Sequence, residues 1–130
     1  TQGQRRIINI VGGTVRGRVN GRVLHGGADY QLITSGTTAV LDARYMLELD
    51  DPALAGARVY VHNHALRRAS AADTARLSRG EQVDPAHVYF RCAPRFEVSH
   101  PALEWMIEHL FVGVGARRPD RVEMSFYQVL

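Results

Sequence analysis

The 130-residue sequence has a single cysteine, no lysine and no long apolar run. Cys92 has no partner for an internal disulfide, which fits a reducing compartment, and we expect a cytoplasmic protein. No apolar run approaches the ~20 residues that span a bilayer, and no signal peptide is visible, so we expect no membrane partner. The start at Thr1 leads us to expect that a natural N-terminal segment is missing.

All the basic charge comes from arginine. Sixteen arginines stand against 13 acidic residues, which gives a net charge of +3. Nucleic-acid-binding domains gather basic residues in a stripe with interleaved aromatics. Here the arginines are scattered, so we expect no nucleic-acid partner and a solvated surface for most of them. Several stand in adjacent pairs: Arg5-Arg6, Arg67-Arg68 and Arg117-Arg118.

The length and composition indicate one globular domain over residues 1–130. Hydrophobic residues make up 45% and charged residues 22% of the chain, both ordinary values. A chain of this size buries enough surface for one real core.

Eight segments have the apolar alternation and β-branched content of strands, with glycine-rich turns between them. The clearest is 38–49, where Leu41 and Tyr45 share one face and Asp42 and Arg44 the other. Eight strands suffice to close a small barrel around side chains or one ligand. The segments are 6–11, 14–24, 28–33, 38–49, 58–66, 88–96, 110–116 and 121–129.

Two further segments have helical signals. Residues 70–79 begin with a Ser70 cap and end at Gly80, and residues 99–109 have Ser99 or His100 at the cap and Pro101 after it. Regular strand–helix alternation is lacking, which argues against a parallel α/β sheet. We therefore predict a mainly β fold, an antiparallel closed or nearly closed barrel of about eight strands with two short helices.

Several ordered motifs resemble a known family. They are 6–14 (RIINIVGGT), 21–31 (GRVLHGGADYQ), 41–45 (LDARY), 89–91 (YFR), 94–97 (PRFE), Trp105 and 111–115 (FVGVG). Together they resemble the bacterial and fungal domain of unknown function 3237, also called uncharacterised protein family 0311. The resemblance implies a calycin-like antiparallel barrel and no established function. The family often has Arg at His62, Thr at Cys92 and Asn at Ile107, so this chain's ligand is expected to differ if those positions line the pocket.

Asp42 and Arg44 stand two apart on a strand and therefore point the same way. They form either a surface ion pair of little energetic value or a pair inside the barrel. In the second case Arg44 anchors a carboxylate, phenolate or carbonyl oxygen of a ligand. Alternation alone does not say which face is inside, so both interpretations stay open.

Two other carboxylates are candidates for proton transfer. Asp29 follows Gly26-Gly27 and is either a turn former or a strand-end acid or base at the barrel mouth. Glu97 is either an acid or base for proton transfer or a structural residue before the second helix, where it would serve as a cap or a salt-bridge partner. Arg91 lies among aromatics and needs an acid, either Glu97 or Asp42, unless it holds an anionic ligand.

His62 and His64 suggest a metal site of the cupin type. Two histidines at i and i+2 on a strand project to one side. The acid that the cupin motif requires after them is absent, so a third ligand would have to come from Glu97, Asp29 or His87. The commoner outcome is one histidine inside the barrel and one near a strand end, with no metal. Cys92 is expected to be a buried small hydrophobe.

Aromatic residues supply the remaining candidates. Most of them, Tyr60 included, belong either to the ordinary core or to the wall of a ligand cavity. Trp105 lies in the second helical segment, where it could close the cavity like a lid and offer its indole N–H. Gly12-Gly13 follows a strand but opens no helix, so no nucleotide-binding glycine pattern indicates a redox cofactor.

These observations predict a small-molecule-binding barrel acting as a cofactor-independent acid–base enzyme: an isomerase, cyclase, lyase or hydrolase for an aromatic or polyketide-like compound. The alternatives are a non-catalytic binding barrel and a cupin-like metalloenzyme using His62 and His64. A homodimer through a sheet face is also expected. The predicted catalytic residues are Asp29, Glu97, Arg44 and Arg91, and the predicted substrate-binding residues are Asp42, Tyr60, His62 and Trp105.

Overall fold

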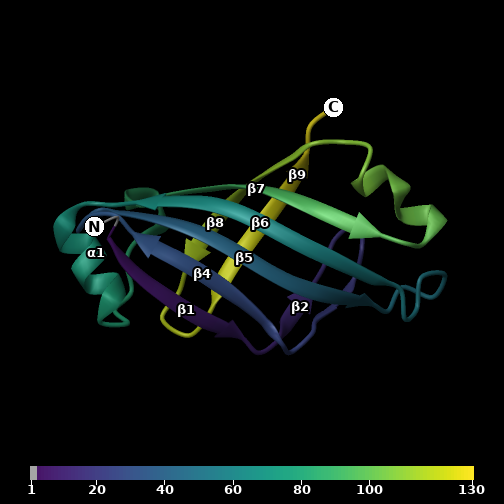
Figure 1. Cartoon of the computed structure of the whole chain (residues 1–130), viewed down its shortest axis with the longest axis horizontal. Helices are drawn as coiled ribbons and strands as arrows, with labels where there is room; N and C mark the ends of the chain where they lie inside the picture. Colours follow the sequence, from purple (N-terminus) through teal and green to yellow (C-terminus); the bar gives the residue numbers. More distant parts are fainter. Residues whose placement is uncertain (1–2) are drawn as a thin grey trace.

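The computed structural model describes residues 3–130, which form nine antiparallel strands in one strongly curved sheet (Figure 1). The main path of the sheet runs β1-β4-β5-β6-β7-β8-β9, and β2 and β3 form a small hairpin attached to β5 through β3. The strands are β1 (Gln4–Ile10), β2 (Gly13–Val15), β3 (Gly21–Val23), β4 (Gly27–Ile33), β5 (Thr38–Leu49), β6 (Arg58–Arg68), β7 (Tyr89–Val98), β8 (Phe111–Arg117) and β9 (Val122–Gln128).

The mainly β prediction is confirmed, with one strand more than expected. The expected strand 14–24 is a hairpin, β2–β3, with a turn over 16–20. Gly17 has a φ of 131°, which favours glycine, and its N–H donates to Asn20 Oδ1 at 3.2 Å. The chain therefore reverses inside a segment whose spaced valines suggested one continuous strand.

Closure of the barrel by hydrogen bonds is not observed. Within residues 3–130, β1 pairs with β4 alone and β9 with β8 alone, so the main path of the sheet has a free edge at each end. The β8–β9 hairpin instead crosses the other strands diagonally (Figure 1). The sheet is thus barrel-like, with a seam between β1 and β9.

The helical segments are short. Helix α1 (Ala71–Ser78) begins after Ser70, whose hydroxyl accepts from the Asp73 N–H, as predicted. The second predicted helix is the 3₁₀ helix η2 (Pro101–Met106), capped by His100. A 3₁₀ turn that was not predicted, η1 (Pro85–His87), precedes β7. None of the helices within residues 3–130 is long and apolar enough to cross a membrane.

The core lies on the concave inner face of the sheet in two apolar clusters. One packs the β5 and β6 ends nearest η2, and the other lies toward α1. On β5 the buried positions are odd-numbered, so alternation makes the even-numbered side chains point outward. The first cluster is Leu47, Leu49, Val59, Val61, Leu103 and Met106; the second is Ala39, Leu41, Ala65, Phe90 and Cys92.

Two glycines let β8 approach the core closely. A Cβ at Gly113 would lie 2.5 Å from Cys92 Sγ, and one at Gly115 would lie 2.8 Å from the Phe90 ring. Any side chain at either position would displace β8 from β7. The glycines of the 111–115 motif therefore serve packing.

Candidate functional site

A row of polar side chains interrupts the apolar inner face, and we call it the inner polar row: Asp29, Gln31 and Asn63. Asp29 and Gln31 are two apart on β4, and the strand register places Asp29 opposite Ala43, which lies opposite Asn63 on β6. Neighbouring strands are about 4.8 Å apart, so Asp29 and Asn63 flank Ala43 at about 10 Å.

The inner polar row contains oxygen atoms that lack partners. Gln31 and Asn63 are only 5% and 4% exposed. Gln31 Nε2 donates to Asp29 Oδ2 at 2.8 Å, but Asp29 Oδ1, Gln31 Oε1 and Asn63 Oδ1 are buried without any hydrogen-bond donor among residues 3–130. Each such acceptor costs about 1–3 kcal/mol. Three in one place is an arrangement suited to a bound molecule with N–H or O–H groups.

Tyr45 and Cys92 add two potential donors to the same face. Burial raises the pKa of the Tyr45 phenol well above its usual value, and the nearby Cys92 and Asp29 raise it further. Burial also raises the pKa of the Cys92 thiol, against a smaller opposing effect from Asn63. Both groups are therefore protonated at neutral pH and can donate a hydrogen bond.

Three arginines lie farther along the inner face, at the α1 end, and we call them the inner arginines: Arg6, Arg67 and Arg117. They line an enclosed cavity of about 40 Å³ together with α1 residues such as Thr74 and Leu77. Burial lowers the pKa of Arg67 to about 10, and repulsion by Arg117 and Arg6 adds to this effect against a weaker opposing effect of Asp29. Burial and Arg6 likewise lower the pKa of Arg117. Positive charge is thus concentrated in a partly buried space.

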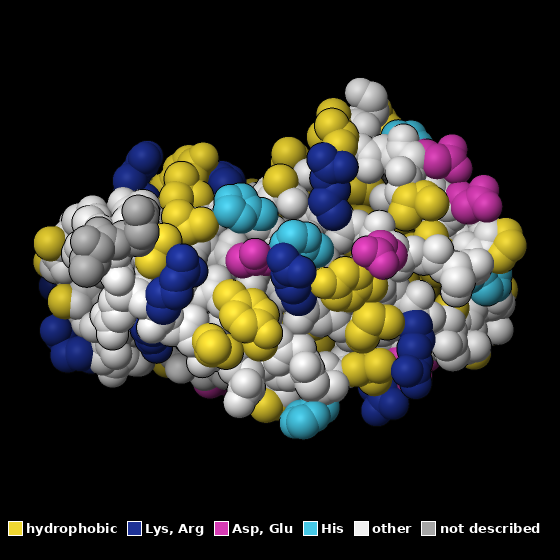
Figure 2. Space-filling view, in the orientation of Figure 1, with side chains coloured by type: hydrophobic (Ala, Val, Ile, Leu, Met, Phe, Trp, Pro, Cys, Tyr) yellow, Lys and Arg dark blue, Asp and Glu magenta, His cyan; other side chains and the backbone are white. Residues whose placement is uncertain are grey.

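Asp42, Arg44 and His62, predicted to converge on the cavity, lie together on the outer face. His62 Nε2 is 2.7 Å and Arg44 Nε 3.5 Å from Asp42 Oδ1. Partial burial raises the Asp42 pKa, but the hydrogen bonds and charges of Arg44 and His62 outweigh this effect and lower it. Figure 2 shows acidic, basic and histidine side chains mixed over the middle of this face.

This placement corrects the interpretation of these three residues as lining the barrel interior. The inner positions of β5 are odd-numbered, since Leu41, Leu47 and Leu49 are buried there. Asp42 and Arg44 must therefore face outward, and their side chains are 36% and 50% exposed. Of the two interpretations left open by the sequence, the location agrees with the surface ion pair.

Glu97, Arg91 and Tyr60 also lie on the outer face. Glu97 is exposed on β7, opposite Tyr60 in the register. Arg91 pairs with neither Glu97 nor Asp42; its Nη1 donates to the Phe90 carbonyl at 3.0 Å, and its guanidinium lies 5.4 Å from the Tyr89 ring centroid. It borders an open groove of about 580 Å³ between β6 and η1. Among the predicted catalytic residues, only Asp29 lies on the inner face.

Trp105 and the two histidines complete the predicted set. Trp105 is half-buried on η2, and its ring is covered by the Arg18 guanidinium, 3.7 Å from the centroid. His64 is exposed and shares the outer face with His62. No group of three or more metal-ligating side chains forms in the part of the chain that the structure describes. The predicted third ligand Asp29 is on the opposite face of the sheet.

The residues that sequence reasoning missed share one signal. Asn63 and Arg67 fall on the same alternating face of β6 as Val59, Val61 and Ala65. A polar residue in such an apolar series is costly to bury and therefore points to a function. The signal is weaker for Gln31, which shares the inner face of β4 with Asp29, and for Arg6, which shares that of β1 with Gln4.

Comparison with known proteins agrees with this architecture. Residues 1–129 match the family described as "Protein of unknown function (DUF3237)". The chain belongs to this family. A UPF0311 protein of Rhodopseudomonas palustris is 46% identical over 98% of this chain and 82% of its own length, and one of Clostridium acetobutylicum is 38% identical over 98% and 78%.

Solved structures of family members have the same fold. The crystal structure of a Rhodopseudomonas palustris protein of unknown function superposes with a TM-score of 0.91 at 46% identity, covering 97% of this chain and 83% of that one. A "beta-barrel like protein" of Acinetobacter baumannii gives a TM-score of 0.80 at 38% identity, covering 98% and 79%. The resemblance noted in the sequence is therefore confirmed, and the fold is barrel-like.

Proposed function

We propose that this protein binds a small molecule on its inner face and exchanges a proton with it through Asp29. The observation that carries the proposal is the set of three buried, unpartnered oxygens: Asp29 Oδ1, Gln31 Oε1 and Asn63 Oδ1. An apolar surface with a few convergent polar groups is the usual form of a ligand site. Aromatic residues of the adjoining core cluster, among them Phe90 and Phe126, are compatible with the aromatic or polyketide-like compound expected from the sequence.

The seam between β1 and β9 supports access to this face. Ile8 lies on the inner face, opposite Asp29 in the register, and is 36% exposed. An apolar side chain at an inner position of a closed barrel would be buried. The exposure of Ile8 therefore supports an approach to Asp29 from the side of β1.

The chemistry expected at this site is proton transfer without a cofactor. Gln31 holds Asp29 Oδ2 through a hydrogen bond, which orients Oδ1 toward the inner face as the acceptor. A proton taken from one atom of the ligand by Oδ1 can be returned to another, which is an isomerisation. The neutral Tyr45 hydroxyl is suited to donate to an oxygen that becomes negative during the transfer.

A ligand-observed NMR screen of small aromatic acids, phenols and polyketide-like lactones tests the proposal. We expect hits that shift the side-chain amide signals of Gln31 and Asn63. Asn63→Ala should weaken these hits by about ten-fold, since it removes a buried hydrogen bond of roughly 1–1.5 kcal/mol. His64→Ala, the outward-facing neighbour on β6, is the matched control and should leave them unchanged.

Turnover of the hits separates the enzyme from the carrier. Asp29→Asn should keep binding and lose conversion by a factor of about 10²–10⁴. Asp42→Asn and Glu97→Gln, on the outer face, should convert normally. Equal conversion by Asp29→Asn and wild type contradicts the acid–base role, and ligands that bind but are never converted by wild type identify a non-catalytic binding barrel.

A further inference from the structure

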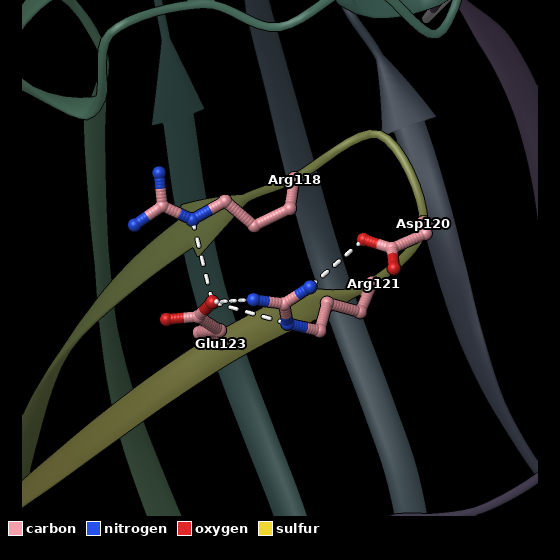
Figure 3. Close-up of polar contacts among 4 residues, drawn as sticks. All are labelled: Arg118, Asp120, Arg121 and Glu123. Carbon is pink, nitrogen blue, oxygen red and sulfur yellow. Dashed lines mark hydrogen bonds and ion pairs between the residues drawn. The ribbon is translucent and has the colours of Figure 1, made fainter.

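The three adjacent arginine pairs of the sequence divide between the two faces of the sheet. Strand neighbours point to opposite sides, so one member of each pair must face inward. Arg5 is exposed, the Arg68 guanidinium lies 5.0 Å from the Tyr89 ring centroid, and Arg118 Nε is 3.3 Å from Glu123 Oε1. Figure 3 shows Arg118 and Arg121 both directed at Glu123, with Asp120 beyond them in the β8–β9 turn. The outer members are thus solvated, stacked or paired with an acid.

The inner arginines lack the acidic partners that the outer members have, although the Arg67 guanidinium lies 6.0 Å from the Phe90 ring centroid. Neither an ion pair nor a hydrogen bond to a protein acceptor is found for Arg6, Arg67 or Arg117 within residues 3–130. Asp29 is an acid on this face that acts on Arg67, but its carboxylate is already bonded to Gln31. Partly buried guanidinium groups without a counter-charge are unfavourable, because burial weakens their hydration. Three at one cavity favour the binding of an anion from outside the chain.

The remaining lining of the cavity fits an oxyanion. Thr74 Oγ1, on α1, is buried without a hydrogen-bond partner among the described residues. Thr38 and Ser78 also line the cavity and carry hydroxyls. Each water molecule in a cavity needs about 10–15 Å³ of cavity volume. A cavity of 40 Å³ therefore holds a group of about three heavy atoms. That is the size of a carboxylate, and a tight fit for a phosphate.

We propose that Arg6, Arg67 and Arg117, with the Thr74 hydroxyl, bind the oxyanion group of a small ligand. Arginine forks match carboxylate and phosphate oxygens in geometry as well as charge. The rest of the ligand would lie over the inner polar row, and for that part this proposal rests on the proposed function. Arg6 is a diagonal neighbour of Asp29 across β1 and β4, at about 7–8 Å between Cα atoms. One small molecule can therefore reach both groups.

The ligand class follows from the two halves of this surface. The inner polar row offers acceptors, so it requires hydroxyl or N–H groups. The inner arginines offer donors and positive charge, so they require an oxyanion. A hydroxylated or amino-substituted aromatic acid, or the corresponding phosphate ester, satisfies both.

Thermal-shift titrations with sodium acetate and with sodium phosphate, at pH 7.5 and constant ionic strength, test the oxyanion site. We expect a saturable rise in Tm for wild type with at least one of the two anions. Arg6→Gln and Arg67→Met should weaken that response at least about ten-fold, the effect of losing a hydrogen bond to a charged group. The outward neighbours provide matched controls: Arg5→Gln and Arg68→Gln should stay within about two-fold of wild type.

The response to each anion identifies the group. A tighter response to acetate assigns a carboxylate, and a tighter response to phosphate assigns a phosphate. Thr74→Val keeps the shape of the side chain and should also weaken the response, which keeps the test valid if an arginine variant fails to fold. An unsaturable response, or equal weakening by Arg5→Gln and Arg6→Gln, overturns the proposal.

Failure here and failure of the proposed function can be told apart. Acetate and phosphate carry no groups for the inner polar row, so they report on the arginines alone. A positive anion response with no organic hit in the NMR screen contradicts only the proposed function. Organic hits that tolerate Arg6→Gln and Arg67→Met contradict only the oxyanion site.

Discussion

Replacing Arg67 by methionine should stabilise the protein in the absence of ligand. The substitution keeps an unbranched side chain and removes a cation that burial and two neighbouring arginines disfavour. Folding lowers the Arg67 pKa from its usual value to about 10, and each pKa unit corresponds to about 1.4 kcal/mol. The difference corresponds to about 3–4 kcal/mol, and solvent at the cavity reduces it. The lost contact with the Phe90 ring, at 6.0 Å, is worth under about 1 kcal/mol.

We therefore expect Arg67→Met to raise the free energy of unfolding by about 1–2 kcal/mol at pH 7, a Tm increase of roughly 3–8 °C. Urea unfolding followed through the single tryptophan, Trp105, measures this change, with an unaltered m-value as the sign that only stability has changed. Arg58→Met, an exposed arginine 3.5 Å from Glu48, is the control and should change stability by less than about 1 kcal/mol.

The pH dependence of this effect has a definite sign. Because folding lowers the Arg67 pKa, the folded chain holds the proton less tightly than the unfolded chain. The destabilisation is fully present below pH 10 and is lost as the pH rises above about 10 toward the usual arginine pKa. The gain from Arg67→Met should therefore be constant from pH 6 to 9. Arg67→Met could instead lower the free energy of unfolding by about 1 kcal/mol or more while Arg58→Met leaves it unchanged. That result would show that a counter-charge stabilises Arg67 in the folded protein, and it would refute the reasoning.

Two further predictions concern packing and the outer face. Gly113→Ala should destabilise the protein by about 2–3 kcal/mol in the same urea assay, because the new Cβ meets the Cys92 sulfur at 2.5 Å; Gly36→Ala, with nothing within 4 Å, is its control and should be neutral. Asp42→Asn should cost less than about 1 kcal/mol at pH 7, since the ion pairs are exposed. Folding lowers the Asp42 pKa, so its contribution is present above pH 3.8 and disappears as the pH falls below that value. Wild type and Asp42→Asn should therefore converge in stability at low pH, and a difference that grows on acidification contradicts this.

Most strands could be predicted because their signals are local. Alternation and turn glycines predicted the strand 38–49 with the bounds that the structure shows, and the Ser70 cap predicted the start of α1. The β2–β3 turn was missed because Val15, Val19 and Val23 keep a regular spacing through it, and all three pack against the same core cluster. Whether the sheet closes depends on pairing between β1 and β9, which are far apart in sequence and leave no local pattern.

The site was harder to predict because it depends on which face of β5 is buried. Both faces of that strand carry apolar residues, Leu41 and Tyr45 on one and Met46 on the other. Asp42 and Arg44 form a recognisable charged pair and so drew attention to the outer face. Asn63, by contrast, is the middle residue of the His62–His64 pair, and the two histidines drew attention away from it. Only the buried state of its neighbours on β6 gives it significance.

The inner face as a whole explains why these polar groups do not neutralise one another. Arg6 stands opposite Gln31 in the register, yet among residues 3–130 neither a donor to Gln31 Oε1 nor an acceptor for the Arg6 guanidinium is found. Acceptors are gathered around Asp29 and donors around Arg67, and the apolar clusters at both ends of the sheet supply the stability that this separation costs. A sequence optimised for stability alone would pair these groups or replace them with apolar residues. Their persistence as two unpaired sets, within reach of one small molecule, is what a ligand site requires of the free protein.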